Sequence, residues 1–569
     1  MLTALKEIGK LLLEKENKQP LDILIENPDS NGSYKIVWVL EFDKDFNFKG
    51  ITQEDFKGEN YKIYLYKRGT GANSPDFSPT SRITEPEKTF TKKFIKWFEN
   101  HKNVPEFEKI LEQLKSNQNQ IIEKLNQLNS LSKDNKIITI KIDGKYLYEI
   151  DLFRKTFLKD FLNKIKEVSK ENAVCSICGR QKDLVFTTSQ IYKFYTLDKE
   201  CYITSGFDKK QAWKNFPVCE ECFLEIYYGK KFVENNLKFK FYGKNYYLIP
   251  KVLLNTPEVL EEISEILSYE RKKINLSKET HKFLTDDKEE ILDLVKDYKD
   301  AVSFYFLFLK KDNAAERILL LVEDVLPSRI HKVFDTKAEV EKIFSQDYTF
   351  ARLNEFLGQH EKLFFEVIDK IFRNGRISFL TLVQVFMRKI RDDFVNGKNF
   401  PKTTTDALMN VSFLEKLGLL KIEGAIMENS KFDEIYKKLG SALNSPAKRG
   451  IFLLGALTQM LLNIQGQERG STPFFKNLKG LKMNEEDIKG LLPKVINKLM
   501  EYGRFDKGKK ELASEISKNL LSEEKFKMSI DEINFYFVSG MTLYDEVAKV
   551  IYEDEKKISW LYRRYVIWN

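Results

Sequence analysis

The sequence is poor in the side chains on which many hydrolases and secreted proteins depend. Its 569 residues include only four histidines, His101, His281, His331 and His360, and their spacing is not that of a metal site. We therefore expect no histidine-based nuclease or hydrolase site, and no nucleophile is paired with a base elsewhere. With only five cysteines, the chain also lacks the disulfide framework of small secreted proteins.

Long apolar runs are missing as well. The longest stretches, such as 301–309 and 451–462, are shorter than the roughly 20 residues that span a bilayer. Charged and apolar residues alternate at helical spacing from the first residues on, which indicates an amphipathic helix rather than a signal peptide. A Walker loop and a dinucleotide fingerprint are also absent. These absences predict a cytoplasmic protein with no membrane partner.

The composition is that of a large globular protein with a small excess of positive charge. Hydrophobic residues make up 42% and charged residues 31%, and the formal net charge is +9. The length suggests about three or four domains. Residues 151–250 carry 18 basic and 12 acidic side chains, whereas 251–569 are nearly neutral, with 52 and 50. Because binding depends on local charge excess, we expect an anionic partner near 151–250.

Strand signals concentrate in the first 250 residues. Aromatic and β-branched residues predict strands over 34–42, 61–66 and 137–142. Asp143-Gly144 then predicts a tight turn into a hairpin partner at 145–148, because this dipeptide tolerates positive φ angles. A helical, polar segment lies between the strands. The region 1–250 is therefore predicted to be mixed α and β.

Helical spacing dominates from residue 257 onward, as over 258–272, 288–299 and 314–325. A candidate joint lies at 396–405, where glycine, proline and three threonines interrupt the pattern. Five later segments predict a compact helical bundle: 407–420, 451–462, 488–502, 511–521 and 530–551. The predicted fold class is α+β multidomain. Its parts are an N-terminal region 1–250, a middle helical region 251–400 and a helical bundle 401–569.

Four of the five cysteines form two CxxC pairs, Cys175/Cys178 and Cys219/Cys222, separated by 40 residues. Two residues between thiols let both sulfurs bind one ion, and two such pairs complete the tetrahedron that Zn²⁺ prefers. We predict a structural Zn²⁺ site in a zinc ribbon inserted at about 171–225. An iron centre and a thiol redox pair remain alternatives. The fifth cysteine, Cys201, is interpreted as an ordinary apolar side chain.

Two stretches combine residue types that suit nucleic acid. The segment 223–251 has six lysines, two glutamates and nine Phe or Tyr residues, which suits phosphate contact and base stacking or, equally well, a half-buried strand with a lysine-coated face. The loop 68–73, Arg-Gly-Thr-Gly-Ala-Asn, follows a predicted strand and carries side chains able to bind base edges. The candidate nucleic-acid contacts are Lys67, Arg68, Asn73, Arg82, Lys230, Lys231, Lys238 and Lys240.

The order of several motifs resembles the large subunit of type I-B CRISPR effector (Cascade) complexes, a family with a zinc ribbon. The N-terminal motifs are the loop 68–73 with Pro79-Thr80 and Thr89-Phe90, then Cys-Ser-Ile-Cys-Gly, then Asn215 to Cys219 leading into 235–239. The C-terminal motifs are 452–455 with 461–465, and 535–541. The paired cysteines are the most specific of these features, and the resemblance covers most of the chain.

This resemblance implies a non-enzymatic subunit of a ribonucleoprotein complex for antiviral defence. Such a subunit would contact the 5′ end of the guide RNA, recognise the motif flanking the target, and help to open double-stranded DNA. Its C-terminal bundle would resemble the effector small subunit, and a separate helicase-nuclease would be recruited to the complex. Other backbone and small subunits would complete the assembly. The alternatives from other classes are a zinc-ribbon scaffold that binds protein partners and an unrecognised zinc-dependent nuclease.

Overall fold

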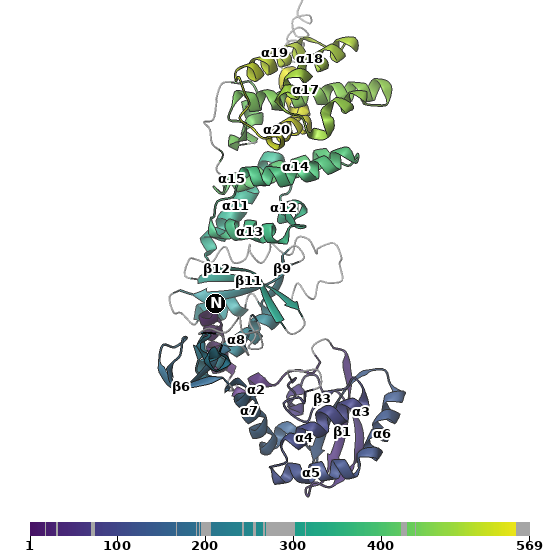
Figure 1. Ribbon diagram of the computed structural model, residues 1–569, viewed down its shortest axis with the longest axis vertical. Helices are drawn as coiled ribbons and strands as arrows, with labels where there is room; N and C mark the ends of the chain where they lie inside the picture. The colour runs from purple at the N-terminus through teal and green to yellow at the C-terminus, as the bar shows by residue number, and fades with distance from the viewer. Residues whose placement is uncertain are drawn as a thin grey trace, which may run out of the picture. The chain divides into compact units, whose positions relative to one another are not determined.

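The computed structural model describes residues 1–552 apart from 17–18, 30–31, 70–73, 167, 189–190, 193, 195–205, 207, 242–243, 254–257, 266–267, 269–301, 313–314, 421, 423–429 and 439. The chain divides into two compact units (Figure 1). The first comprises Met1–Asn235 with Lys311–Arg317, and the second comprises Asn236–Lys310 with Ile318–Asn569. Among the described residues, no helix is both long and apolar enough to cross a membrane.

The first unit is built on a sheet with strand order β2-β1-β4-β3, and β5 pairs with β4. The strands are β1 (Tyr34–Phe42), β2 (Phe48–Asp55), β3 (Ser81–Arg82), β4 (Asn135–Ile142) and β5 (Lys145–Tyr146). β1 and β4 run parallel, whereas the other pairs are antiparallel. The strands predicted at 34–42 and 137–142 are confirmed. The predicted turn is confirmed too, since Asp143 and Gly144 have φ angles of 50° and 73°.

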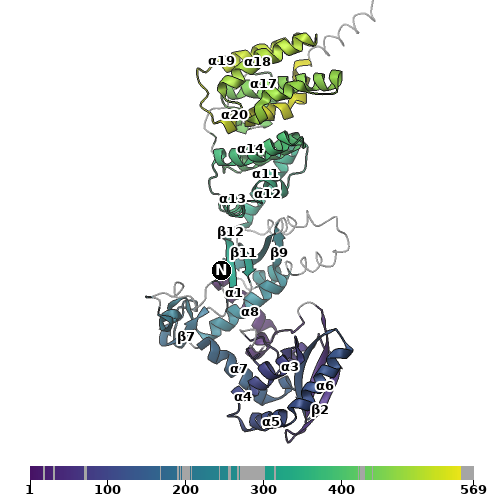
Figure 2. The same ribbon diagram turned by 45° about the vertical axis from the view of Figure 1, so that its right-hand side comes forward.

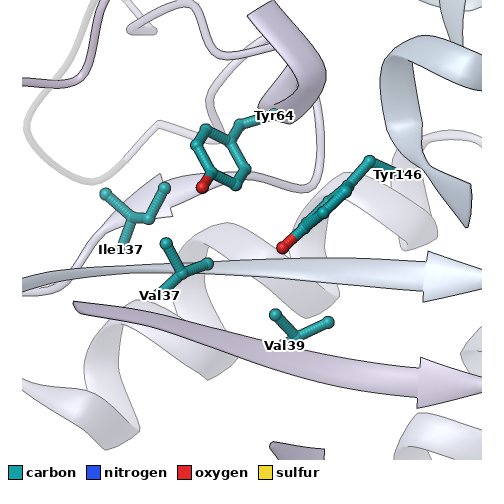
Figure 3. Close-up of a cluster of buried hydrophobic side chains, with 5 residues drawn as sticks. All are labelled: Val37, Val39, Tyr64, Ile137 and Tyr146. Atoms are coloured by element: carbon teal, nitrogen blue, oxygen red, sulfur yellow. The ribbon is translucent and has the colours of Figure 1, made fainter. Parts of the chain in front are cut away.

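The strand predicted at 61–66 is wrong, because this segment forms the short 3-10 helix η1 (Tyr61–Tyr64). The helix places the Tyr64 ring in a buried cluster with Val37, Val39, Ile137 and Tyr146 (Figure 3). The Tyr64 and Tyr146 rings meet edge to face, with centroids 5.2 Å apart. Packing of Tyr64 over the sheet therefore overrides the strand propensity of its neighbours.

The first unit also contains helices, some of which pack on this sheet. They are α1 (Leu2–Glu16), α2 (Pro20–Leu24), α3 (Pro86–Thr89), the π-helix η2 (Phe90–Ile95), α4 (Lys96–Asn100), α5 (Pro105–Ser116), α6 (Gln118–Leu131), α7 (Asp151–Lys166) and α8 (Glu220–Asn236). Helices α5 and α6 contact β2 (Figure 2). Helix α1 packs on α8 at two glycines, where a Cβ on Gly9 would lie 1.8 Å from the Glu225 carbonyl oxygen. Only glycine permits this approach.

The second unit begins with a sheet of order β12-β11-β10-β9. Its strands are β9 (Lys238–Phe241), β10 (Lys244–Val252), β11 (Val302–Asp312) and β12 (Ala315–Val325). The helix predicted at 314–325 is therefore wrong. Its five consecutive apolar residues, 318–322, fit a helix and a strand equally well, and pairing with β11 decides between them. Residues 258–265 are helical as predicted, and the helix predicted at 288–299 lies outside the described residues.

The remaining described part of the second unit is mainly helical, as predicted. Its elements are α11 (Pro327–Phe344), α12 (Phe350–Leu357), α13 (Glu361–Arg373), α14 (Phe379–Val395), α15 (Phe400–Lys416), α16 (Asp433–Lys438), η7 (Gly440–Leu443), α17 (Pro446–Arg469), η8 (Pro473–Leu481), α18 (Glu485–Glu501), α19 (Lys507–Leu521) and α20 (Ile530–Thr542). Helix α17 is buried along most of its length and packs against α18, α19 and α20. It is the central helix of the bundle.

The candidate joint at 396–405 contains a short turn and the start of α15. Asn399 caps this helix by accepting a hydrogen bond from the Lys402 amide, and Pro401 lies in its first turn. Helix α15 packs against α20 and also against α11, α12 and α14. It is tied to the preceding part by the buried hydrogen bond from Tyr348 to Asn410, 2.7 Å, and by an ion pair between Arg352 and Asp406. The domain boundaries at 250 and 400 stay predictions.

These contacts predict how fragments should behave. A fragment 401–552 should be helical and melt cooperatively. A fragment 327–552 keeps the neighbours of α15 and should therefore melt roughly 5 °C higher, which corresponds to a free energy of unfolding larger by about 2 kcal/mol. Circular dichroism during heating measures both. Equal melting temperatures would contradict a stabilising role for α11–α14, and a non-cooperative shorter fragment would contradict an independent bundle.

Candidate metal centre and nucleic-acid interface

The first cysteine pair lies in the turn of a hairpin between β6 (Ser169–Val174) and β7 (Gln181–Thr187). The Cys175 amide donates to the Arg180 carbonyl oxygen at 3.0 Å, and the Gly179 amide donates to the Cys175 carbonyl oxygen at 2.9 Å. Gly179 has a φ angle of 67°, a conformation that glycine adopts without strain. The Cys-Ser-Ile-Cys-Gly motif thus forms the tight knuckle that its sequence predicts.

The second pair lies where the short strand β8 (Pro217–Val218) meets helix α8. β8 pairs with β7, and the Ser176 amide donates to the Pro217 carbonyl oxygen at 2.8 Å, so the two pairs are held side by side. Cys219 precedes the helix, and Cys222 lies in its first turn. The Cys219 amide also points at the Cys175 sulfur, 3.4 Å away. The strand-to-helix junction therefore completes the site.

The structure brings the four predicted ligands together. Their sulfurs all lie within 4.8 Å of one another, and only Cys178 is partly exposed. Zn–S bonds of about 2.3 Å in a tetrahedron need sulfurs about 3.8 Å apart, so the cluster is the right size for one metal ion. Cys201 lies outside the described residues.

The thiol environment also suits a cation. Burial raises the pKa of Cys175, but hydrogen bonds from the backbone amides of Cys178, Cys219 and Ile177 outweigh it and lower the pKa to about 7. Burial and the neighbouring sulfurs raise the pKa of Cys222. Four packed sulfurs cannot all become thiolates unless positive charge compensates them. The donor set therefore fits a divalent metal ion.

The loop 68–73 is held at its base by two carboxylates. The Arg68 amide donates to Glu26 Oε2 at 3.2 Å, and the Gly69 amide donates to Asp76 Oδ1 at 2.8 Å. The Phe77 amide closes the base by donating to the Lys67 carbonyl oxygen at 3.0 Å. A Cβ at position 69 would lie 2.2 Å from the Pro75 carbonyl oxygen, so this position requires glycine. The two ends of the loop are therefore fixed in the fold.

Asp76 is itself fixed from the other side. Its side chain is buried, and its Oδ2 accepts a 2.6 Å hydrogen bond from the Ser81 hydroxyl. Lys93 Nζ lies 3.5 Å from the same oxygen and balances its charge. Lys93 is supplied by the π-helix η2, an irregularity often found at functional sites.

Lys67 lies inside the protein, with only 6% of its surface exposed. Its Nζ donates to Glu26 Oε1 at 3.0 Å and to the Tyr227 hydroxyl at 2.8 Å. Burial disfavours the charged amine, but Tyr227 and Glu26 outweigh it, and the pKa of Lys67 is raised. A contact of Lys67 with nucleic acid stays a prediction, and it requires the amine to leave these partners.

The other N-terminal candidates differ in exposure. Arg68 is exposed, whereas Asn73 lies outside the described residues. Arg82 is partly buried: its Nε donates to the Pro28 carbonyl oxygen at 2.8 Å, and its guanidinium lies over the rings of Tyr34 and Tyr66, 5.3 and 5.6 Å from their centroids. Of Lys67, Arg68 and Arg82, Arg68 is thus the residue that is exposed to solvent.

The four candidate lysines of 223–251 also differ in their surroundings. Lys230 Nζ donates to the Ile191 carbonyl oxygen at 2.5 Å and lies 3.6 Å from Glu316. Lys231 Nζ donates to the Ile23 carbonyl oxygen at 2.6 Å, and burial lowers the pKa of Lys231 to about 7. Lys238 is exposed on β9. Lys240 is also on β9, but its side chain lies outside the described residues. Nucleic-acid binding by these lysines stays a prediction.

Comparison with known families accounts for nearly all of the sequence. The N-terminal, central and C-terminal domains described as CRISPR-associated protein TM1802 match residues 1–159, 172–325 and 348–555. The chain belongs to this CRISPR-associated family. The resemblance to a type I-B CRISPR protein is therefore confirmed. No curated protein matches the chain.

The family domains follow the structural elements. The TM1802 N-terminal domain holds the loop 68–73 and its two carboxylates, and the central domain begins within β6 and ends with β12. The four cysteines therefore belong to the central domain. The TM1802 C-terminal domain covers α12 to α20.

The C-terminal domain also carries exposed basic residues, which the nearly neutral charge count of 251–569 does not reveal. Nine lysines on η8, α18, α19 and their flanking turns are exposed, of which Lys479 pairs with Asp487. The other eight are Lys476, Lys482, Lys494, Lys507, Lys510, Lys518, Lys525 and Lys527. Many acidic residues in the same elements are instead engaged in capping or in ion pairs, as Asp487 and Asp506 are. Exposed lysines therefore occur in a region of nearly neutral composition, together with exposed acidic residues such as Glu486 and Glu524.

Proposed function

We propose that this chain is the large subunit of a type I-B CRISPR RNA-guided surveillance complex. The observation that carries the proposal is the match of all three TM1802 domains along the chain. In this proposal its partners are the guide RNA, whose 5′ end it contacts, the target duplex and the backbone and small subunits. It opens the duplex and recruits a helicase-nuclease. The chain is not an enzyme, since that separate protein cuts the DNA.

The loop 68–73 is the proposed reader of the target-flanking motif. Its base is fixed by Glu26 and Asp76, and Arg68 projects to solvent beside it. Arg and Asn side chains can form paired hydrogen bonds with base edges in the major groove. Guide pairing then supplies most of the sequence specificity, and the protein reads only the short flank.

The cysteine cluster is the proposed site of one structural Zn²⁺, held by Cys175, Cys178, Cys219 and Cys222. Four thiolates fill the coordination sphere and leave no position for a reacting water. The metal would therefore stabilise the fold without taking part in chemistry. Its position at the start of α8 supports this role, because the ion joins a hairpin to a helix that packs in the first unit.

Phosphate contact is assigned to exposed lysines. Lys238 on β9 and the eight lysines of η8, α18 and α19 offer charged groups to solvent. In the proposal the C-terminal lysines hold the displaced DNA strand. Each lysine that contacts a phosphate of single-stranded DNA should contribute roughly 0.7 to the slope of log affinity against log salt.

Two substitutions in the loop test the reading of the flank. In a reconstituted complex, Asn73→Ala should change the preference among flanking sequences, because losing a good base contact costs about 1–3 kcal/mol for the correct base. Arg68→Ala should either change the preference in the same way or weaken all targets equally, which would identify a phosphate contact. Binding to a set of duplexes that differ only in the flank measures both. Wild-type preference in both variants would refute the assignment of this loop.

A protein-binding scaffold is the second candidate function. It is favoured by two apolar side chains beside the cysteine pairs, Val174 and Phe216, which are 57% and 43% exposed. Exposed apolar groups of this kind often mark protein contacts. Copies of the chain that bind partner proteins but no nucleic acid would support this candidate over the first.

A further inference from the structure

One face of α8 runs from the metal site to the base of the loop 68–73. Cys219, Phe223, Tyr227 and Lys231 follow one another at intervals of four residues, so they lie along one side of the helix. The Phe223 and Tyr227 rings stack with centroids 6.0 Å apart. Phe223 also contacts Phe186 of β7, centroids 5.4 Å apart. The Phe223 amide donates to the Cys219 carbonyl oxygen at 2.9 Å, so this row of rings is joined through the backbone to a predicted metal ligand.

The far end of this row holds the segment that carries the loop. The Tyr227 hydroxyl accepts a 2.8 Å hydrogen bond from Lys67 Nζ, and Lys67 also bonds Glu26 Oε1 at 3.0 Å. The other oxygen of Glu26 accepts the Arg68 amide. Lys231 adds a bond to the Ile23 carbonyl oxygen, three residues before Glu26. Tyr227 is thus linked to the Arg68 backbone by three hydrogen bonds, through the Lys67 amine and the Glu26 carboxylate.

The charges make this connection hard to rearrange. Lys67 is buried, and without Tyr227 its charge would keep only Glu26 and the Leu24 carbonyl oxygen, 3.4 Å away, as hydrogen-bond acceptors. A buried charge that loses an acceptor draws its remaining partners toward it. Because Glu26 is shared between Lys67 and the Arg68 amide, a shift of Glu26 also moves the Arg68 amide at the base of the loop.

We propose that α8 couples the cysteine site to residues 67–69 at the base of the loop, and that Tyr227 is a positioning residue that sets how sharply the chain discriminates among sequences flanking the target duplex. The inference rests on the proposed function for its second half. The first half, coupling between the metal site and the amides of Arg68 and Gly69, concerns this chain alone.

Amide hydrogen exchange on the full chain tests the coupling. Removing the metal with a chelator should speed exchange at Arg68 and Gly69 roughly tenfold, the effect of losing one hydrogen bond to a charged group. In Tyr227→Phe these amides should already exchange faster with the metal bound, and chelation should add little. Unchanged exchange at these amides after chelation of the wild type would overturn the proposal.

Tyr146→Phe is the matched control. The Tyr146 hydroxyl is also hydrogen-bonded to a charged group, although it donates, to Glu54 Oε2 at 2.7 Å, where Tyr227 accepts; Tyr146 lies in the sheet cluster with Val39 and Ile137 (Figure 3). This variant should lose a comparable hydrogen bond and leave the metal response of Arg68 and Gly69 unchanged. A control that uncouples the site as Tyr227→Phe does would show general destabilisation and overturn the role of Tyr227.

The specificity role is tested in the reconstituted complex. Tyr227→Phe should keep one zinc per chain yet change the affinity ratio between the best and worst flanking sequences about fivefold to tenfold. A purely structural role would lower affinity for all flanks equally and leave this ratio fixed, which would overturn the inference. If the wild-type complex itself does not discriminate among flanks, the proposed function fails instead.

Discussion

Replacing Cys219 with serine should empty the cysteine site and unfold the module around it. Cys219 joins the two pairs, since its amide contacts the Cys175 sulfur and its chain continues directly into α8. Structural zinc contributes about 10–16 kcal/mol to the folding of small zinc domains, comparable with the stability of a whole domain. Zinc content should fall from about one to near zero per chain, and residues 169–236 should become sensitive to protease.

The fifth cysteine and the second unit are internal controls for this experiment. Cys201→Ser should keep its zinc, because the described cluster is complete without it. The helical bundle should remain folded in Cys219→Ser, because all four ligands belong to the first unit. Stoichiometric zinc in Cys219→Ser, or a freshly purified wild type without metal, would contradict the assigned site.

A single methyl group at Gly540 should strongly destabilise the C-terminal bundle. A Cβ at this position would lie 1.8 Å from the Phe452 carbonyl oxygen, and a Cβ on Gly455 would lie 2.0 Å from the Phe537 carbonyl oxygen. The atoms in the way are backbone, so α17 and α20 must separate along their whole contact. We expect Gly540→Ala to lower the free energy of unfolding by about 3 kcal/mol or more, at the upper end of the range for overpacked cores.

Gly490→Ala provides the matched comparison. It makes the same substitution in a helix of the same bundle, but a Cβ there meets no atom within 4 Å. Because alanine has a higher helix propensity than glycine, this variant should raise the free energy of unfolding by about 0.5–1 kcal/mol. Urea unfolding of the full chain, followed by circular dichroism, measures both. Similar midpoints for the two alanine variants would mean that α17 and α20 do not approach as closely as described.

Local patterns predicted the features that short segments determine. The CxxC spacing predicted a knuckle that the Gly179 turn completes, and Asp143-Gly144 predicted a hairpin. The strands predicted at 34–42 and 137–142 form the parallel pair at the centre of the first sheet. In each case the residues that determine the conformation are near neighbours, so the sequence alone carries the information.

Contacts between residues far apart in the sequence explain the features that local patterns did not predict. Lys67 resembles a surface lysine until Tyr227, 160 residues away, supplies its hydrogen-bond acceptor. The segment 61–66 has strand composition, yet it forms the 3-10 helix η1, which packs Tyr64 on the sheet. The apolar run 318–322 becomes a strand because β11 pairs with it. Burial and pairing of this kind depend on the whole fold.

Co-purification would show whether the chain works inside an RNA-guided complex. The full chain should be isolated from its own cells under native conditions, and the bound RNA and proteins should be identified. If the chain is a subunit of such a complex, we expect short guide RNAs in stoichiometric amount together with several protein subunits. Partner proteins without nucleic acid, or a chain that purifies alone, would contradict this expectation.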